Sequence, residues 1–175
     1  LLTTDPSNMN YLTGYDGWSF YVPQGVILSI DEDQPFWFGR KQDSNGARIT
    51  TYLNEENIFG YPENLIQSPP SHPYDFVVEL FKDKKWSHKN IGVEMDSYYY
   101  TAENHKRLKE NLENAKFINA HLLINWVRYI KSENEIKYMK DAGTLVKAGM
   151  QTAFDSIKEG VKQSTVAGKI QNTLI

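Results

Sequence analysis

A helix start at Ser132 limits how this chain can be organised. Ser132 and Glu135 have the spacing of a capping box, in which each side chain accepts a hydrogen bond from a backbone N–H of the new helix. Apolar or small residues then follow at the three-and-four spacing of one helical face: Ile136, Met139, Gly143, Val146, Met150, Ala153 and Ile157. Gly160 ends this predicted helix, and a second helix begins at Ser164 or Thr165. Two helices with nothing to cover their apolar faces indicate the start of a second domain, so we expect the chain to be a fragment.

Composition limits the class of protein. Of the 175 residues, 40% are hydrophobic and 13% are aromatic, which suffices for a packed core and argues against disorder. The chain has no cysteine, which excludes disulfide scaffolds and thiolate nucleophiles and fits a reducing compartment. No apolar run approaches the ~20 residues that span a bilayer, and the first residues lack the pattern of a signal peptide. A net charge of −3 leaves no electrostatic footprint for nucleic acid. From these features together we expect a cytoplasmic protein that binds neither nucleic acid nor membrane.

Apolar runs and turn signals predict the order of elements in the first two-thirds of the chain. Strands are expected at 1–4, 25–30, 35–38, 58–61, 91–96 and 115–120, with a polar turn at 5–8. Helices are expected within 43–53, 74–84, 101–112 and 122–129. A strand-rich opening followed by alternating strands and helices predicts an α/β fold, with a mixed sheet flanked by helices.

The usual catalytic signatures are missing from the sequence. It contains no nucleophile elbow, phosphate loop, dinucleotide fingerprint or zinc-protease motif. The four histidines lie in separate segments, and none has a metal-ligand spacing. His72, in a proline-rich connector, is kept as a candidate binding residue. We predict no catalytic and no metal-binding residue within this chain.

Glu94 and Asp96 lie two positions apart on a predicted strand and therefore share one of its faces. Carboxylates on strands hold pairs of metal ions in some nucleases. We favour the alternative, a strand end that emerges into solvent, because the chain lacks a basic surface.

An aromatic segment and an arginine-rich turn are the better candidates for ligand binding. The segment crowds five rings between glycines: Tyr11, Tyr15, Trp18, Phe20 and Tyr21. Trp18 and Phe20 are candidates for an apolar wall or for a face that binds a delocalised cation, with core packing as the open alternative. Arg40 and Arg48 are candidates to hold a carboxylate through paired hydrogen bonds. A salt bridge from Asp43 to either arginine is the simpler alternative.

Two stretches of the chain have a family pattern. They are Asn8-Met9-Asn10-Tyr11-Leu12-Thr13-Gly14 and the junction Arg128-Tyr129-Ile130-Lys131-Ser132-x-x-Glu135-Ile136, with Ala142-Gly143 and Glu159-Gly160 after it. They resemble the creatinase/prolidase ("pita-bread") hydrolases. The resemblance implies a ribonuclease H-like N-terminal domain over residues 1–127 and, over 128–175, the linker and first helices of a truncated α+β catalytic domain. It also implies a homodimer, and catalytic groups that lie beyond this chain.

The resemblance leaves the cofactor and the substrate open. Peptidases of this family use a divalent metal pair (Mn, Co or Zn), whereas creatinases cleave without metal, so a metal in the full-length protein is an expectation and none is expected in this fragment. The creatinase segment Ser-Phe-Gly-Arg corresponds here to Ser19-Phe20-Tyr21-Val22, which lacks the arginine and argues against creatine. Four stretches look most like ectoine hydrolase: 18–23, 37–40, 42–48 and 125–128. Ectoine combines a cyclic amidinium with a carboxylate, which suits an aromatic face and an arginine. The alternatives are an Xaa-Pro dipeptidase acting on a dipeptide, and an inactive relative that serves as a binding module.

Overall fold

The computed structural model describes residues 1–175, which divide into two compact units, Leu1–Arg128 and Tyr129–Ile175. The first unit is built on a six-stranded sheet with the order β4-β3-β2-β1-β5-β6. The strands are β1 Leu2–Thr3, β2 Gly25–Ile27, β3 Phe36–Arg40, β4 Ile58–Tyr61, β5 Asn90–Val93 and β6 Lys116–Asn119. Strand β2 is antiparallel to both β1 and β3, and the other neighbours are parallel. The mixed sheet predicted from the sequence is therefore confirmed.

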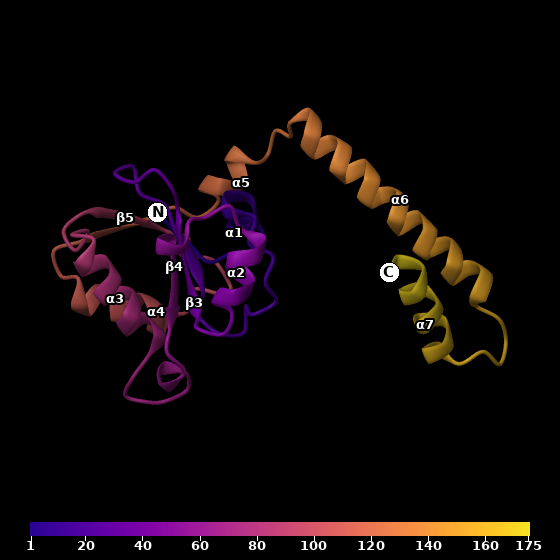
Figure 1. Ribbon diagram of the computed structural model, residues 1–175, viewed down its shortest axis with the longest axis horizontal. Helices are drawn as coiled ribbons and strands as arrows, with labels where there is room; N and C mark the ends of the chain where they lie inside the picture. Colours follow the sequence, from indigo (N-terminus) through magenta and orange to yellow (C-terminus); the bar gives the residue numbers. More distant parts are fainter. The chain divides into compact units, whose positions relative to one another are not determined.

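Helices cover both faces of this sheet, because its strands carry apolar side chains on both faces. In β3, Phe36 and Phe38 belong to one hydrophobic cluster, whereas Trp37 belongs to the other. Helices α3 (Pro73–Asp83) and α4 (Ala102–Asn111) lie on one side, and α1 (Pro6–Thr13) and α2 (Ser44–Thr50) lie on the other (Figure 1). The remaining elements of the first unit are short: η1 Glu55–Asn57, η2 Glu63–Leu65 and α5 Leu123–Val127.

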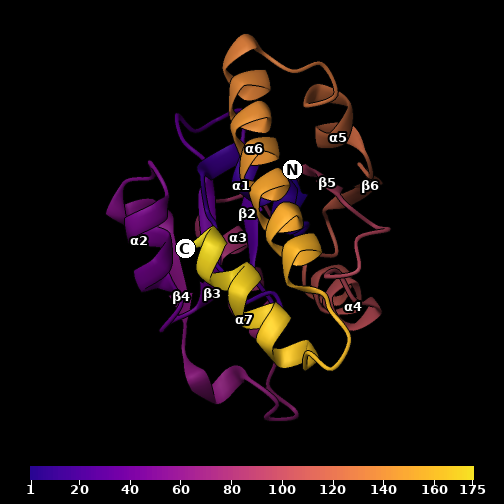
Figure 2. The same ribbon diagram turned by 90° about the vertical axis from the view of Figure 1, so that its right-hand side faces the viewer.

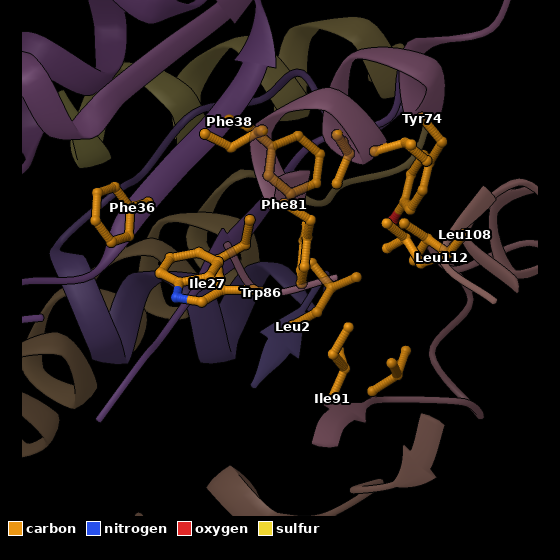
Figure 3. Packing of buried hydrophobic residues seen from close by; sticks show 14 of the residues in the cluster. Leu2, Ile27, Phe36, Phe38, Tyr74, Phe81, Trp86, Ile91, Leu108 and Leu112 are labelled. Carbon is orange, nitrogen blue, oxygen red and sulfur yellow. The ribbon is translucent and has the colours of Figure 1, made fainter. Parts of the chain in front are cut away.

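The larger core lies between the sheet and helices α3 and α4 (Figure 3). Its rings meet edge to face: the ring centroids of Phe36 and Trp86 lie 5.5 Å apart, and those of Phe38 and Tyr74 lie 6.0 Å apart. Leu108, on α4, is fully buried in this core. Burial of each large apolar side chain stabilises the fold by about 1.5–3 kcal/mol. This core therefore holds the strand ends, and the loops that leave them, in defined positions.

The second unit is a pair of helices. Helix α6 (Glu133–Ser156) begins at the predicted capping box, in which Ser132 N donates to Glu135 Oε2 at 2.7 Å and Glu135 N donates to Ser132 Oγ at 3.3 Å. Helix α7 (Gln163–Leu174) lies back along α6 (Figure 2), and the side chain of Leu174 packs where Gly149 leaves room. Much of the predicted apolar face is exposed: Ile136, Met139, Val146 and Met150 on α6, and Ile157 directly after it. None of the helices is long and apolar enough to cross a bilayer.

The turn predicted at residues 5–8 is instead the start of helix α1. Asp5 Oδ1 accepts hydrogen bonds from Ser7 N at 3.0 Å and Asn8 N at 3.1 Å, and Pro6 takes the first helical position. Gly14, with φ of +82°, ends the helix. An acceptor at the N-cap, proline at the first position and glycine after the last are the ordinary signals of a helix, and here they outweigh the turn propensity of the same residues.

Other element boundaries differ by a few residues from the prediction. Helix α2 ends at Thr50 rather than continuing through Leu53, because Thr51 is extended and its hydroxyl bonds the carbonyl of Ala47. Asp43 occupies the N-cap of α2, but its side chain makes no capping bond. Helix α6 stops at Ser156 instead of Gly160, because the β-branched Ile157 adopts an extended conformation.

Candidate functional site

One edge of the sheet collects most of the residues selected from the sequence. The register pairs Thr3 with Val26, Arg40 with Tyr61, and Val93 with Asn119, so β1, β3, β4, β5 and β6 all end where β2 begins. We call the loops at this place the carboxyl edge; they comprise residues 4–5, 18–24, 40–43, 61–63, 94–101 and 120–123. Open α/β sheets bind ligands outside the carboxyl ends of their strands, so this edge is the candidate site.

Trp18 and Phe20 lie together in the loop that leads into β2. Their rings meet edge to face with centroids 4.8 Å apart, and Phe20 contacts Tyr99 in the same manner at 5.6 Å. Trp18 is 81% exposed and Phe20 is half-buried, so neither is a core residue. We call Trp18, Phe20 and Tyr99 the aromatic tip. Tyr99 was not selected from the sequence, where no spacing connects it to the loop before β2.

Two tyrosines hold the base of this loop. Tyr15 is buried, packs on Trp37 with centroids 5.1 Å apart, and donates its hydroxyl to Gln24 Oε1 at 3.0 Å. Tyr61 donates its hydroxyl to the carbonyl of Pro23 at 2.6 Å. Burial raises the pKa of both tyrosines above the ordinary value of 10.0, so both remain protonated donors near neutral pH. The loop that carries Trp18 and Phe20 is therefore fixed at its base.

Arg40 and Arg48 line one surface hollow of about 640 Å³ beside the start of α2. Arg40 Nε lies 2.9 and 2.7 Å from the carboxylate oxygens of Glu63, and Arg48 Nε lies 2.7 and 2.8 Å from those of Glu55. The hydrogen bonds from Arg40 lower the pKa of Glu63. The predicted salt bridge from Asp43 is therefore wrong, because each arginine holds a glutamate from a turn beside β4. Both guanidinium groups have the geometry for a carboxylate, and both already hold one.

His72 caps helix α3. Its ring Nδ1 accepts a hydrogen bond from Tyr74 N at 3.1 Å, and its backbone N–H donates to Asp75 Oδ2 at 2.8 Å. Arg107 braces this cap by donating to Asp75 at 3.0 and 3.3 Å and to the carbonyl of Pro70 at 3.0 Å. Burial and, second, the charge of Arg107 lower the pKa of His72, which favours the neutral imidazole that the cap requires.

Glu94 lies inside the protein, and the prediction that it emerges into solvent is wrong. It is 2% exposed, and its Oε2 accepts from Thr4 N at 2.9 Å and Asp5 N at 3.1 Å. Its Oε1 accepts from Asn8 Nδ2 at 2.7 Å. Strand β5 ends at Val93, so strand alternation does not continue to Asp96, which is exposed. The two carboxylates therefore do not face one another as a metal pair requires.

Asn8 extends the contacts of Glu94 to the end of the first unit. Its Nδ2 also donates to Asn125 Oδ1 at 2.9 Å, and Arg128 Nη1 donates to Asn8 Oδ1 at 3.0 Å. The Arg128 guanidinium lies 5.9 Å from the ring centre of Tyr11. We call Asn8, Glu94, Asn125 and Arg128 the polar cluster. Three of its members lie in stretches that show the family resemblance, but their spacing along the chain does not predict the contact.

The residues of this chain do not fit a divalent metal. No three His, Cys, Asp or Glu side chains are grouped so that they could hold one. At the carboxyl edge, Glu63 is taken up by Arg40 and Glu94 by three N–H groups. No step of a reaction is therefore assigned to a metal held by these residues.

Comparison with known proteins gives a family and several relatives. Residues 1–130 match the family model described as the Creatinase/Prolidase N-terminal domain. The chain is 43% identical to the ectoine hydrolase of Halomonas elongata and 44% identical to an uncharacterized hydrolase/peptidase of Sinorhizobium fredii. Each match covers 97% of this chain and 43% of the relative.

Solved structures share the fold. The Xaa-Pro dipeptidase of Bacillus anthracis has a TM-score of 0.68 at 20% identity, covering 99% of this chain and 43% of that one. The prolidase of Pyrococcus furiosus has a TM-score of 0.68 at 17% identity, covering 99% of this chain and 46% of its own. This chain thus spans less than half the length of each of these four proteins. Together these matches show that the chain belongs to the creatinase/prolidase N-terminal domain family.

Proposed function

We propose that this chain forms the substrate-access part of a C–N bond hydrolase whose substrate is a small zwitterion of the ectoine type. The aromatic tip carries this proposal. Trp18 stands exposed on Phe20 at the carboxyl edge, and the stretches around these residues belong to a chain that is 43% identical to an ectoine hydrolase. An exposed indole face attracts a delocalised cation such as a cyclic amidinium.

The candidate residues have different roles in this proposal. Trp18 and Phe20 would contact the substrate, because the rings lie at the surface and have no structural duty in the core. Arg40 and Arg48 would anchor the substrate carboxylate by exchanging Glu63 or Glu55 for it, a swap between chemically equal partners. His72 ranks last, since its Nδ1 is engaged by the N–H of Tyr74.

We further propose that residues 1–127 are one domain and that 128–175 are the linker and first helices of a catalytic domain. The apolar residues left exposed on α6 are suited to packing against such a domain. In this proposal the groups that activate water, with any divalent metal, belong to the region of the relatives that this chain does not span. A homodimer partner would complete the site.

The proposal is tested by turnover. The gene product that contains this chain is purified and supplied separately with ectoine and with the dipeptide Ala-Pro, with and without added Mn²⁺, Co²⁺ or Zn²⁺. Hydrolysis of ectoine and not of Ala-Pro is the expected result. The reverse preference would favour the second candidate, an Xaa-Pro dipeptidase, which is supported by 26% identity to a putative dipeptidase of Bacillus subtilis. Binding of ectoine without turnover would indicate the third, an inactive binding module.

A further inference from the structure

We infer that Tyr99 is a positioning residue, whose ring sets the orientation of Phe20 and, through it, of Trp18. The inference deepens the proposed function, on which its meaning for the substrate rests. Its structural content does not depend on any substrate.

The geometry of the aromatic tip carries the inference. Phe20 stands between two rings, with Trp18 from its own loop at 4.8 Å and Tyr99 from the loop after β5 at 5.6 Å. The interplanar angles are 71° and 64°, which is the edge-to-face arrangement that aromatic pairs prefer. Tyr99 is thus the ring through which Trp18 and Phe20 contact a second loop.

The loop that carries Tyr99 is itself held firmly. Tyr99 N donates to Ser97 Oγ at 3.3 Å, and the same Oγ accepts from the hydroxyl of Thr4 at 3.0 Å. Ser97 N donates to the carbonyl of Glu94 at 3.1 Å, and Asn104 Nδ2 reaches the carbonyl of Tyr99 at 3.5 Å. These bonds tie the backbone around Tyr99 to the residue after β1, to the buried Glu94 and to α4. The ring of Tyr99 therefore stands on a fixed support.

The loop of Trp18 and Phe20, by contrast, is fixed at its base and exposed at its end. Tyr15 and Tyr61 hold its base through Gln24 and Pro23, whereas Trp18 is 81% exposed. The end of such a loop can lie docked on a neighbouring ring or be released into solvent. One aromatic pair favours the docked position about 2- to 13-fold. Removal of the Tyr99 ring is therefore expected to release the end of the loop while its base stays in place.

The test compares three variants of the 175-residue chain by NMR. Tyr99→Leu removes the ring, Tyr99→Phe keeps it, and Tyr98→Leu is the matched control, because Tyr98 is the adjacent tyrosine and is 97% exposed. The readouts are the Phe20–Tyr99 ring NOE and the backbone order parameters of residues 17–20. In Tyr99→Leu we expect those order parameters to fall from about 0.85 to below about 0.6. Tyr99→Phe and Tyr98→Leu should match the wild type.

Unchanged order parameters in a folded Tyr99→Leu variant, or an equal loss in Tyr98→Leu, would overturn the inference. Should Tyr99→Leu fail to fold, Tyr99→Met takes its place: it lacks the ring, leaves the Trp18–Phe20 contact intact, and must release residues 17–20 equally. Because no substrate enters these measurements, a negative result here is distinct from failure of the ectoine assay, which concerns the proposed function alone.

Discussion

The side-chain amide of Asn8 donates a hydrogen bond to Glu94 Oε1 at 2.7 Å and thereby joins helix α1 to the loop after β5. A buried carboxylate is tolerated only where hydrogen-bond donors replace the water that it has lost. Here Thr4 N, Asp5 N and Asn8 Nδ2 provide three such donors. Through Asn125 and Arg128, the same cluster reaches the last residues of the first unit. The polar cluster thus joins helix α1 and the end of the first unit to Glu94 at the carboxyl edge.

Replacing Glu94 by alanine is expected to lower the free energy of unfolding of the first unit by about 3 kcal/mol or more, because buried N–H groups lose their acceptor at about 1–3 kcal/mol each. Urea unfolding followed by near-UV circular dichroism measures the change. Asp96→Ala is the control, since this nearby carboxylate is exposed and should alter stability by less than about 0.5 kcal/mol. Equal losses in the two variants would contradict the structural importance of Glu94.

Two glycine substitutions should have effects of opposite sign. Gly14 has φ of +82°, and a Cβ there would lie 2.9 Å from the carbonyl oxygen of Thr50, so Gly14→Ala should destabilise the protein by about 1–3 kcal/mol. Gly46 lies within α2 with open space around it, so Gly46→Ala should stabilise it by about 0.5–1 kcal/mol. Thermal unfolding of both variants tests this. A shift of the melting temperature in the same direction for both variants would be inconsistent with the backbone conformations of Gly14 and Gly46.

The cap of α3 should make stability depend on pH. The pKa of His72 is lowered on folding from the ordinary 6.5, so the unfolded chain takes up the proton first as the pH falls. The contribution of His72 is therefore complete above about pH 6.5 and is lost as the pH falls through the folded-state pKa. His72→Asn keeps a capping acceptor that does not titrate. We expect the melting temperature of the wild type to fall more than that of His72→Asn between about pH 7.5 and pH 5. Parallel pH profiles would refute this.

Trp18→Ala tests the aromatic face itself. In the gene product that contains this chain, we expect the KM for ectoine to rise about 2- to 30-fold, the equivalent of a cation–π contact. The free energy of unfolding should change by less than about 0.5 kcal/mol, because Trp18 is exposed. Ile30→Ala is the control, since Ile30 is fully exposed and follows the opposite end of β2. An unchanged KM in a folded Trp18→Ala enzyme would make Trp18 a packing residue only.

Local signals in the sequence determined the elements. The capping box at Ser132 is present as predicted, and the helix expected within 101–112 begins with a contact of the same local kind, the cap at Thr101. The apolar run of β3 likewise encodes a strand that is buried on both faces. The one α-helix that was missed, α1, carried its own signals in Asp5 and Gly14. Such features are readable because backbone geometry sets the spacing at which neighbouring residues meet.

The candidate site was decided by tertiary structure. Glu94 is buried because β5 ends beside β1, which places its carboxylate under the N–H groups of Thr4 and Asp5. Tyr99 reaches Phe20 for a similar reason, since the sheet order places β2 and β5 on either side of β1, and the loop before β2 and the loop after β5 leave the same edge. Spacing along the chain carries no information on which loops a mixed sheet gathers at one edge. By itself, the sequence determined which segments become strands and helices, whereas strand order and register determined which side chains meet.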